Sequence, residues 1–456
     1  MQMPDSSAAQ GQRQALMALC GKRLDAYNLI IASNRGPVEF RREEDALRSS
    51  RGQGGLVTAV SSMAEVMDAT WVAAAMGPAD LEAAREGSGR VTVSLHGHPV
   101  KVSFVAPTAE QYHAYYDQIA NSVLWFLQHH ITNPPAHPTF DQALWEAWND
   151  GYVAVNRLFA ERLVEEAEQD GRRPLFMVQD YHLYLVPGML RELAPEGLIQ
   201  HFTHVAWPGP DTWRQVPKAI RDRLLEAMLG CDVIGLHCQR YVFNFLLCCQ
   251  ELLGREVDWE QRAVKDGDRW VRVRDYPISI DPDALADFAD APDVLRAEAA
   301  LMRHRPKNLI VQVARTDPSK NILRSFYAYE QFLLQYPEFH ERVQFLGLLP
   351  TSRQTTELYK EYLVELRQVA DRINEDYGSE TWQPLELFLD NDYARGIAAM
   401  KHYDVLVVNS IADGMNLVAK EGPIVNRRHG VLVISEATGA VDELGEAALV
   451  VNPFDL

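Results

Sequence analysis

The sequence predicts an α/β protein made of two doubly wound, Rossmann-like domains. The first observation is length: 456 residues exceed the roughly 250–300 at which a single hydrophobic core stops growing. The second is that short apolar runs alternate with amphipathic helical patterns in both halves of the chain. Such alternation is typical of mostly parallel sheets covered by helices on both faces.

In the first half, four apolar runs predict buried strands, at residues 29–32, 175–178, 200–204 and 232–236. Between the last two runs, residues 211–229 carry apolar side chains every four positions, which predicts one amphipathic helix. A polar hairpin is expected over residues 257–274, because Asp266-Gly267-Asp268 is a typical turn sequence.

The domain boundary is expected in residues 276–282, where Pro277 and Pro282 bracket an extended segment, giving domains 1–280 and 281–456. Beyond it, strands are predicted at residues 309–313, 343–349, 385–389, 405–408, 431–434 and 448–451. Ligands of open parallel sheets bind beyond the carboxyl ends of the strands. Two such domains facing across a cleft would suit an enzyme with two substrates.

The composition narrows the class of partner. With 44 basic and 63 acidic residues, the net charge of −19 argues against nucleic acid and anionic membranes as partners, because both need a basic surface.

The five cysteines are odd in number and irregularly spaced, so buried reduced thiols are expected rather than disulfides or a metal site. No run of 18 apolar residues and no signal-peptide pattern is present, which favours the cytoplasm. Assembly into a homo-oligomer is left open.

Three motifs of the first half could carry chemistry. Arg35 follows the first strand, and Gly54 and Gly55 lie in a glycine-rich stretch whose backbone could approach a phosphate. Such stretches are mostly ordinary loops, and this one lacks the dinucleotide-binding pattern, so a nicotinamide cofactor gains little support. Asp180 and His204 stand at predicted strand ends, where a lone acid or histidine is more often structural than catalytic.

Two motifs of the second half are more specific. Arg315 and Lys320 stand five residues apart across a turn, where two cations could hold one anion, although a solvated surface turn fits equally well. The run from Asp413 to Glu421 begins with poor helix-forming residues and then enters a helix near Asn416. A carboxylate one turn inside that helix, Glu421, could accept two hydrogen bonds from a vicinal diol.

Taken in order, these motifs, together with residues 121–125 and 350–353, resemble the trehalose-6-phosphate synthase family. That family comprises retaining GT-B glycosyltransferases that use a nucleotide sugar, and the resemblance runs from about Leu29 to Asn452. It implies an enzyme that moves glucose from a nucleotide-glucose donor, UDP- or GDP-glucose, to glucose 6-phosphate. The implied product is α,α-trehalose 6-phosphate.

The resemblance also implies roles for individual residues. The donor would be bound by Gly54, Gly55, Arg315, Lys320, Asn391, Asp413, Gly414, Met415, Asn416, Leu417 and Glu421. The phosphorylated acceptor would be bound by Arg35, Tyr116, Trp125, Asp180 and Arg353. His204 would lie beside the transferred glucose and act in catalysis with Asp180, Arg315 and Lys320. No metal, cofactor or protein nucleophile is implied, because the leaving diphosphate helps to deprotonate the attacking hydroxyl.

Several positions depart from the family pattern. Residues 71–77 replace a Gly-Trp-Ser-Gly-like segment, Ala314 replaces an acidic residue, and Asn391 replaces an aromatic near the base. These departures also resemble the pseudo-glycosyltransferases that couple cyclitols, although the intact Met415 and Arg353 argue against that branch. The acceptor could therefore be glycerol 3-phosphate or a cyclitol phosphate. A catalytically weak sugar-phosphate sensor is the alternative of another class, disfavoured by the intact donor residues.

Overall fold

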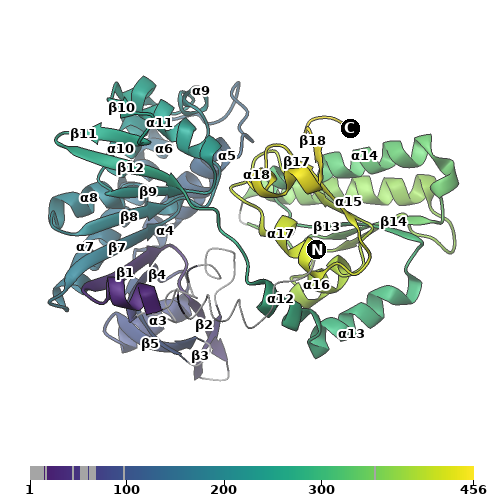
Figure 1. Cartoon of the computed structure of the whole chain (residues 1–456), viewed down its shortest axis with the longest axis horizontal. Helices are drawn as coiled ribbons and strands as arrows, with labels where there is room; N and C mark the ends of the chain where they lie inside the picture. Colours follow the sequence, from purple (N-terminus) through teal and green to yellow (C-terminus); the bar gives the residue numbers. More distant parts are fainter. Residues whose placement is uncertain are drawn as a thin grey trace. The chain divides into compact units, whose positions relative to one another are not determined.

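The computed structural model describes residues 15, 18–43, 46–51, 60, 68–95, 98–353 and 356–456. The chain divides into two compact units (Figure 1). The first consists of Met1–Gln128 and Thr132–Pro277, and the second of His129–Ile131 and Ile278–Leu456. Among the helices of the described ranges, none is both long and apolar enough to cross a membrane.

The sheet of the first unit has ten strands in the order β10-β11-β12-β9-β8-β7-β1-β4-β6-β5. Their bounds are β1 Tyr27–Ser33, β4 Ala69–Ala74, β5 Arg90–Leu95, β6 His98–Val105, β7 Arg173–Gln179, β8 Leu198–Phe202, β9 Val233–Leu236, β10 Val257–Asp258, β11 Ala263–Asp266 and β12 Arg269–Asp275. The seven strands from β12 to β6 are parallel, and β5, β10 and β11 are antiparallel edges. Strands β2 (Val38–Glu43) and β3 (Ala46–Arg51) form a separate hairpin. The strand order reverses between β1 and β7.

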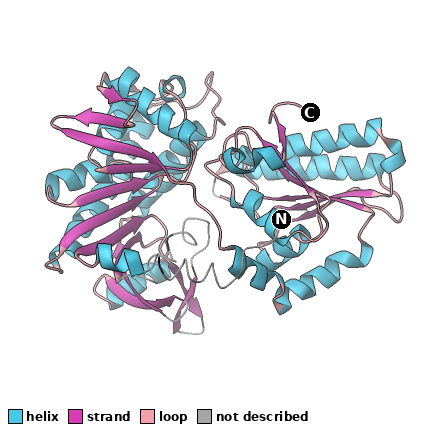
Figure 2. Ribbon diagram, viewed as in Figure 1, coloured by secondary structure: helices cyan, strands magenta, loops and turns pink. Residues whose placement is uncertain are grey.

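Helical segments connect these strands (Figure 2). They are α3 Pro78–Glu86, α4 Ala109–His113, η1 Ala114–Leu124, α5 Trp125–Gln128, α6 Gln142–Glu146, η2 Ala147–Val153, α7 Ala154–Glu168, η3 Tyr181–Leu183, α8 Val186–Leu193, α9 Pro210–Trp213, α10 Lys218–Met228 and α11 Gln239–Leu253. Helix α7 packs across β1, β4, β6 and β7 through its buried Phe159 and Leu163. The central strands β1 and β4 are almost entirely buried and mostly apolar, as is typical of parallel sheets covered on both faces.

The second unit is a smaller parallel sheet with strand order β15-β14-β13-β16-β17-β18. The strands are β13 Asn308–Val313, β14 Val343–Leu348, β15 Leu385–Phe388, β16 Val405–Val408, β17 Val431–Ser435 and β18 Leu449–Val451. The helical segments are α12 Pro282–Ala289, α13 Pro292–Leu301, η4 Met302–His304, η5 Pro318–Lys320, α14 Ile322–Gln335, η6 Pro337–Phe339, α15 Glu357–Tyr377, α16 Tyr393–Met400, α17 Leu417–Val425, α18 Val441–Leu444 and η7 Gly445–Ala447. Counted along the chain, this is the 3-2-1-4-5-6 order of a doubly wound nucleotide-binding fold.

Alternation along the strands builds two cores in this unit. Leu309 and Val311 of β13 point into the core beneath α12, α13, α16 and α17, whereas Ile310 points into the core beneath α14 and α15. Successive strand residues face opposite sides of a sheet, so one strand supplies both cores. Helices α14 and α15 lie side by side in Figure 1.

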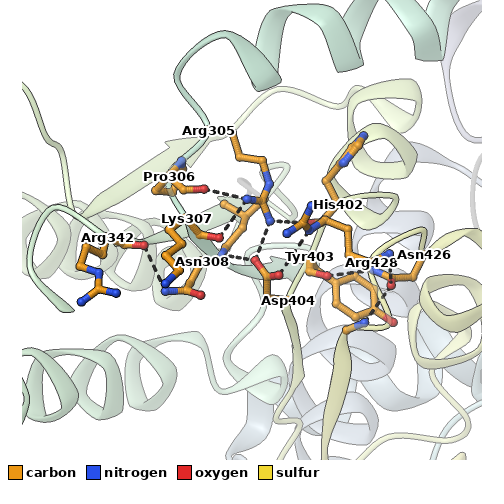
Figure 3. A network of polar contacts seen from close by, with 12 residues as sticks. Arg305, Pro306, Lys307, Asn308, Arg342, His402, Tyr403, Asp404, Asn426 and Arg428 are labelled. Carbon is orange, nitrogen blue, oxygen red and sulfur yellow. Dashed lines mark hydrogen bonds and ion pairs between the residues drawn. The ribbon is translucent and has the colours of Figure 1, made fainter.

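A polar network fastens the amino end of this sheet (Figure 3). Oδ2 of Asp404, just before β16, accepts hydrogen bonds from the backbone N–H of Leu309 at 2.8 Å and from Nη2 of Arg305 at 2.6 Å. The Arg305 guanidinium also donates to the carbonyls of Pro306, Lys307 and His402. These contacts join the starts of β13 and β16.

The predicted fold class and strands are confirmed, with two local corrections. The single helix expected at residues 211–229 is wrong, because the chain forms α9 and α10 with a break before Lys218. Pro217 explains the break: it has no N–H to donate and it disfavours helical geometry at Val216. Strand β8 ends at Phe202, so His204 lies two residues beyond the strand that it was expected to close.

Candidate active site

In the second unit, the strand order reverses between β13 and β16, the place where doubly wound sheets bind ligands. The loop after β13 carries Arg315 and Lys320, and the loop after β16 carries Asp413. Lys320 Nζ and Asp413 Oδ2 are 2.5 Å apart, and their side chains are 14% and 12% exposed. The topology thus brings together two charged residues that are 93 positions apart in the sequence.

The carboxylate of Asp413 is held by several donors at once. Besides Lys320, it accepts from Ser410 Oγ at 3.0 Å and from Asn416 Nδ2 at 2.9 Å. Burial alone would raise the pKa of Asp413, but Lys320 and Asn416 outweigh burial and keep the pKa below its usual value. Asp413 is therefore ionised at neutral pH, and it holds Lys320 in a fixed position.

Helix α17 starts directly beside this pair. Its N-cap is Asn416, whose Oδ1 accepts from the Ala419 N–H at 3.2 Å, and whose φ of 75° is unusual for a residue other than glycine. The amino end of the nine-residue helix adds partial positive charge, which favours an anionic ligand. Gly439 of the loop after β17 packs so closely that a Cβ there would lie 2.0 Å from the Gly414 carbonyl. The loops around Asp413 are therefore tightly fixed.

Arg353, in the loop after β14, contacts the loop after β13 in the same unit. Its Nη1 is 3.3 Å from Oδ2 of the fully buried Asp317, which also accepts from Tyr359 Oη at 2.9 Å. Burial would raise the pKa of Asp317, but Arg353 and Arg315 lower it well below its usual range. Arg353 has a φ of 45°, a strained value for an arginine. Sequence reasoning missed Asp317 and Tyr359, because only the fold brings the loops after β13 and β14 together.

Glu421 lies on α17, half-buried, and its Oε1 accepts from Tyr393 Oη at 3.2 Å. Burial raises the pKa of Glu421, and the Tyr393 hydrogen bond partly opposes that effect. Asn391 is exposed between β15 and α16, whereas Met415 is part of the hydrophobic core, so Met415 contributes packing. Gly54 and Gly55 lie outside the described residues.

Four buried polar atoms around the Lys320–Asp413 pair have no hydrogen-bond partner among the described residues. They are Gln312 Oε1, Ser319 Oγ, Asn409 Oδ1 and Thr438 Oγ1. Buried polar groups are normally satisfied, so such a group of orphaned atoms fits a place that holds a ligand or ordered water. Of these residues, Asn409 directly follows the apolar strand β16, whereas Gln312 lies within β13 and Ser319 and Thr438 lie farther along their loops.

The first unit has a corresponding reversal between β1 and β7. Arg35 follows β1, and Asp180 follows β7 with φ 72° and ψ 171°, a region nearly restricted to glycine. The Asp180 N–H donates to the Phe202 carbonyl at 2.7 Å, and Asp180 Oδ1 accepts from the His204 N–H at 3.0 Å. Backbone strain that surrounding contacts hold in place is typical of functional sites.

Aromatic rings surround this position. Tyr116 is stacked between Tyr112 at 5.3 Å and His182 at 5.7 Å between ring centroids, and Trp125 packs against Tyr181. Burial would lower the pKa of Arg35, but a hydrogen bond with Tyr116 and the charge of Glu39 raise it. Arg35 and Tyr116 therefore lie together, and Arg35 Nη1 is also 3.2 Å from Glu39 Oε1.

His204 is an uncharged histidine. Burial and the nearby His237 and His201 lower its pKa well below the usual value. Its Nε2 lies 3.0 Å from Gln179 Oε1, so Nε2 carries the hydrogen and Nδ1 is the acceptor. In the described ranges, no three His, Cys, Asp or Glu side chains are arranged to hold a metal ion.

The fold and the charged switch point agree with the class of protein that the sequence resemblance implies. Two Rossmann-like domains, one with cations and a helix amino end at its switch point, fit the GT-B architecture of a nucleotide-sugar glycosyltransferase that the resemblance implies. The family model of glycosyltransferase family 20 matches residues 27–456, and the chain belongs to that family. It is therefore a glycosyltransferase, and the family resemblance found in the sequence is confirmed.

Individual relatives are similar over nearly the whole chain. The Schizosaccharomyces pombe UDP-forming α,α-trehalose-phosphate synthase is 32% identical, covering 96% of this chain and 83% of the relative. The Mycobacterium avium trehalose-6-phosphate synthase is 32% identical, covering 94% and 86%. An E. coli structure bound with UDP-2-fluoro glucose has a TM-score of 0.79 at 27% identity, covering 94% and 88%. A Burkholderia xenovorans synthase in complex with glucose-6-phosphate has a TM-score of 0.78 at 26% identity, covering 94% and 89%.

Proposed function

We propose that this glycosyltransferase transfers glucose from UDP-glucose to glucose 6-phosphate with retention, giving α,α-trehalose 6-phosphate. The observation that carries the proposal is the similarity over nearly the whole chain to synthases named as UDP-forming. Neighbouring structures that hold UDP-2-fluoro glucose and glucose-6-phosphate support the same two substrates.

The donor would bind at the carboxyl edge of the second unit's sheet. Arg315, Lys320 and the amino end of α17 would hold the diphosphate, with Gly54 and Gly55 near it. Glu421 would accept the ribose hydroxyls, and Asn391 would lie near the base. Residues 413–417 would contact the sugar and the phosphates. The short Lys320–Asp413 contact supports this assignment, because it holds a cation in place before the ligand arrives.

The acceptor would bind at the switch point of the first unit. Arg35 and Tyr116 would hold its phosphate, and the family resemblance assigns Arg353 to the phosphate as well. Asp180 and Trp125 would contact the sugar, and the neutral His204 would accept a hydrogen bond through Nδ1 from a glucose hydroxyl. The strained backbone of Asp180 supports a role for that residue.

In the transfer step, the bond between the anomeric carbon and the diphosphate oxygen breaks. The acceptor hydroxyl forms a new bond on the same face of the sugar, and its proton passes to the departing diphosphate. The protein positions the two substrates and stabilises the charge that develops on the leaving group. Arg315 and Lys320 would supply that stabilisation without a metal.

A product assay tests the proposal. The full chain is incubated with UDP-glucose or GDP-glucose and glucose 6-phosphate, and the product is identified by mass and by the NMR signals of its two anomeric carbons. A non-reducing α,α-1,1-linked disaccharide phosphate with release of UDP is expected. Absence of any disaccharide with every nucleotide sugar would refute the proposal.

The residues at the end of β4 leave a phosphorylated acceptor other than glucose 6-phosphate as an alternative. At the end of β4, residues 73–75 are alanines, and the preceding Trp71 is fully buried with its Nε1 donating to Ser33 Oγ at 2.8 Å. Trp71 therefore does not replace the aromatic residue of the family pattern. The assay accordingly includes glycerol 3-phosphate and a cyclitol phosphate. The cytoplasm remains the proposed compartment, and gel filtration would determine whether the chain forms a homo-oligomer.

A further inference from the structure

Tyr393 of the second unit has an exposed aromatic ring that contacts two other helices. It is the first residue of α16 and is 54% exposed, one of three exposed Phe, Tyr or Trp side chains in the described part of this unit, with Tyr336 and Phe454. Its ring stacks on Phe288 of α12, with centroids 5.3 Å apart and an interplanar angle of 24°. Its hydroxyl lies 3.2 Å from Oε1 of Glu421 on α17. Three helices therefore fix the orientation of an exposed ring.

We propose that Tyr393 is a positioning and binding residue for the nucleoside of the donor. Its hydroxyl orients the Glu421 carboxylate toward the ribose diol, and its exposed ring offers a surface on which the base stacks. The inference rests on the proposed function, because it takes the ribose to bind at Glu421.

The hydroxyl contact follows from the chemistry of a carboxylate. Glu421 has two oxygens with four lone-pair positions, and the bond from Tyr393 occupies one position on Oε1. Binding a vicinal diol requires the carboxylate to be ionised and held in one orientation. Burial favours the neutral form of Glu421, and the donated hydrogen bond of Tyr393 opposes that preference. Tyr393 thus supports both requirements.

The stacking contact follows from the connectivity of a nucleoside. The base is attached at C1′ of the ribose, adjacent to C2′, whose hydroxyl Glu421 would bind. A ring whose hydroxyl touches Glu421 is therefore within reach of the base. Every nucleobase has a flat face, so an exposed tyrosine is a suitable platform. Phe288 supports the ring, which reduces the entropy lost when the base binds.

Calorimetric titration of the full chain with UDP tests the inference. Tyr393→Phe keeps the ring and loses the hydroxyl, and should weaken UDP binding about three- to tenfold. Tyr393→Ala also loses the stacking surface and should weaken binding about tenfold further. Tyr336→Phe alters another exposed tyrosine of the same unit, at the end of α14, and should bind UDP like the wild type. With UDP-glucose as substrate, the donor KM should rise in both Tyr393 variants while kcat stays constant.

A second ligand separates this role from a purely structural one. With 2′,3′-dideoxy-UDP, which has no diol, the loss caused by Tyr393→Phe should disappear, while the further loss in Tyr393→Ala should remain. Equal losses with both ligands would overturn the positioning role, and wild-type affinity in Tyr393→Ala would overturn the stacking role. A wild-type chain that binds UDP, with variants that bind equally well, contradicts this inference alone. A wild-type chain that neither binds UDP nor turns over contradicts the proposed function, and the inference with it.

Discussion

The two ends of the second unit's sheet carry similar charge pairs that have different surroundings. At the amino end, Asp404 pairs with Arg305, and at the carboxyl end, Asp413 pairs with Lys320. Arg305 and Asp404 bond mainly to backbone groups that join β13 to β16. Asp413 bonds to side chains on loops, next to the amino end of a helix. A buried ion pair therefore does not by itself indicate a site; its other hydrogen-bond partners distinguish a scaffold from a binding edge.

Removing the exposed cation at the carboxyl end should have the largest effect. Arg315→Ala is expected to lower kcat about 10- to 150-fold at saturating donor, because a charge-assisted contact to the leaving diphosphate is lost. Arg428→Ala is the matched control, since this arginine pairs with Asp404 at the amino end. Steady-state kinetics of the two variants check the comparison. Normal turnover in Arg315→Ala would remove Arg315 from the donor site.

The opposite pattern is expected at the amino end. Asp404→Ala leaves the Leu309 N–H and the Arg305 guanidinium without their acceptor, which should cost about 2 kcal/mol of unfolding free energy. Chemical denaturation measures this loss. The kcat of the folded variant should stay within about twofold of the wild type. A strong loss of turnover in a well-folded Asp404→Ala would contradict the distinction between the two ends.

Arg353 tests the assignment of the acceptor phosphate. Arg353→Ala should reduce kcat/KM for glucose 6-phosphate about 10- to 150-fold and barely change the slow reaction with free glucose. Asp317, which pairs with Arg353, offers a second variant: Asp317→Asn should raise the KM for glucose 6-phosphate more than that for the donor. Equal losses with both acceptors would place Arg353 outside the phosphate site.

The pH dependence of donor binding should reflect the protonation of Glu421 and not that of His204. Burial raises the pKa of Glu421, so the carboxylate is protonated at a higher pH than an ordinary glutamate, and donor affinity should fall as the pH decreases through that value. His204 has a lowered pKa and stays neutral, so it should add no step near pH 6.5. The expected change is a severalfold rise in donor KM at acidic pH. If Glu421→Gln keeps the wild-type pH profile, another group is responsible.

The smallest expected effect is that of a chelator. Excess EDTA should leave turnover unchanged, because Arg315, Lys320 and the amino end of α17 supply the positive charge that a metal would otherwise provide. The assay compares initial rates with and without EDTA and with added Mg²⁺ or Mn²⁺. Loss of activity that Mg²⁺ or Mn²⁺ restores would show that a metal is required.

The sequence predicted the strands of the second unit and β1, β7, β8 and β9 of the first, but it did not predict β4, β5 and β6 or the contacts between elements. The strands were predictable because parallel strands buried on both faces are continuous apolar runs, as in β13 and β16. Pro217 could have predicted the break between α9 and α10, but the apolar side chains at every fourth position favoured a single helix over residues 211–229. The Lys320–Asp413, Asp317–Arg353 and Tyr393–Glu421 contacts could not be predicted from spacing, because each joins loops or helices brought together by the strand order.

Hydrogen exchange measured with and without UDP tests the central claim most directly, that the carboxyl end of the second sheet binds the nucleotide and the amino end does not. UDP should slow exchange in peptides that cover residues 314–321 and 410–421. Peptides that cover residues 303–309 and 426–431, at the amino end, should exchange equally in both samples. Protection confined to the amino end, or absent from both ends while UDP binds, would contradict the account.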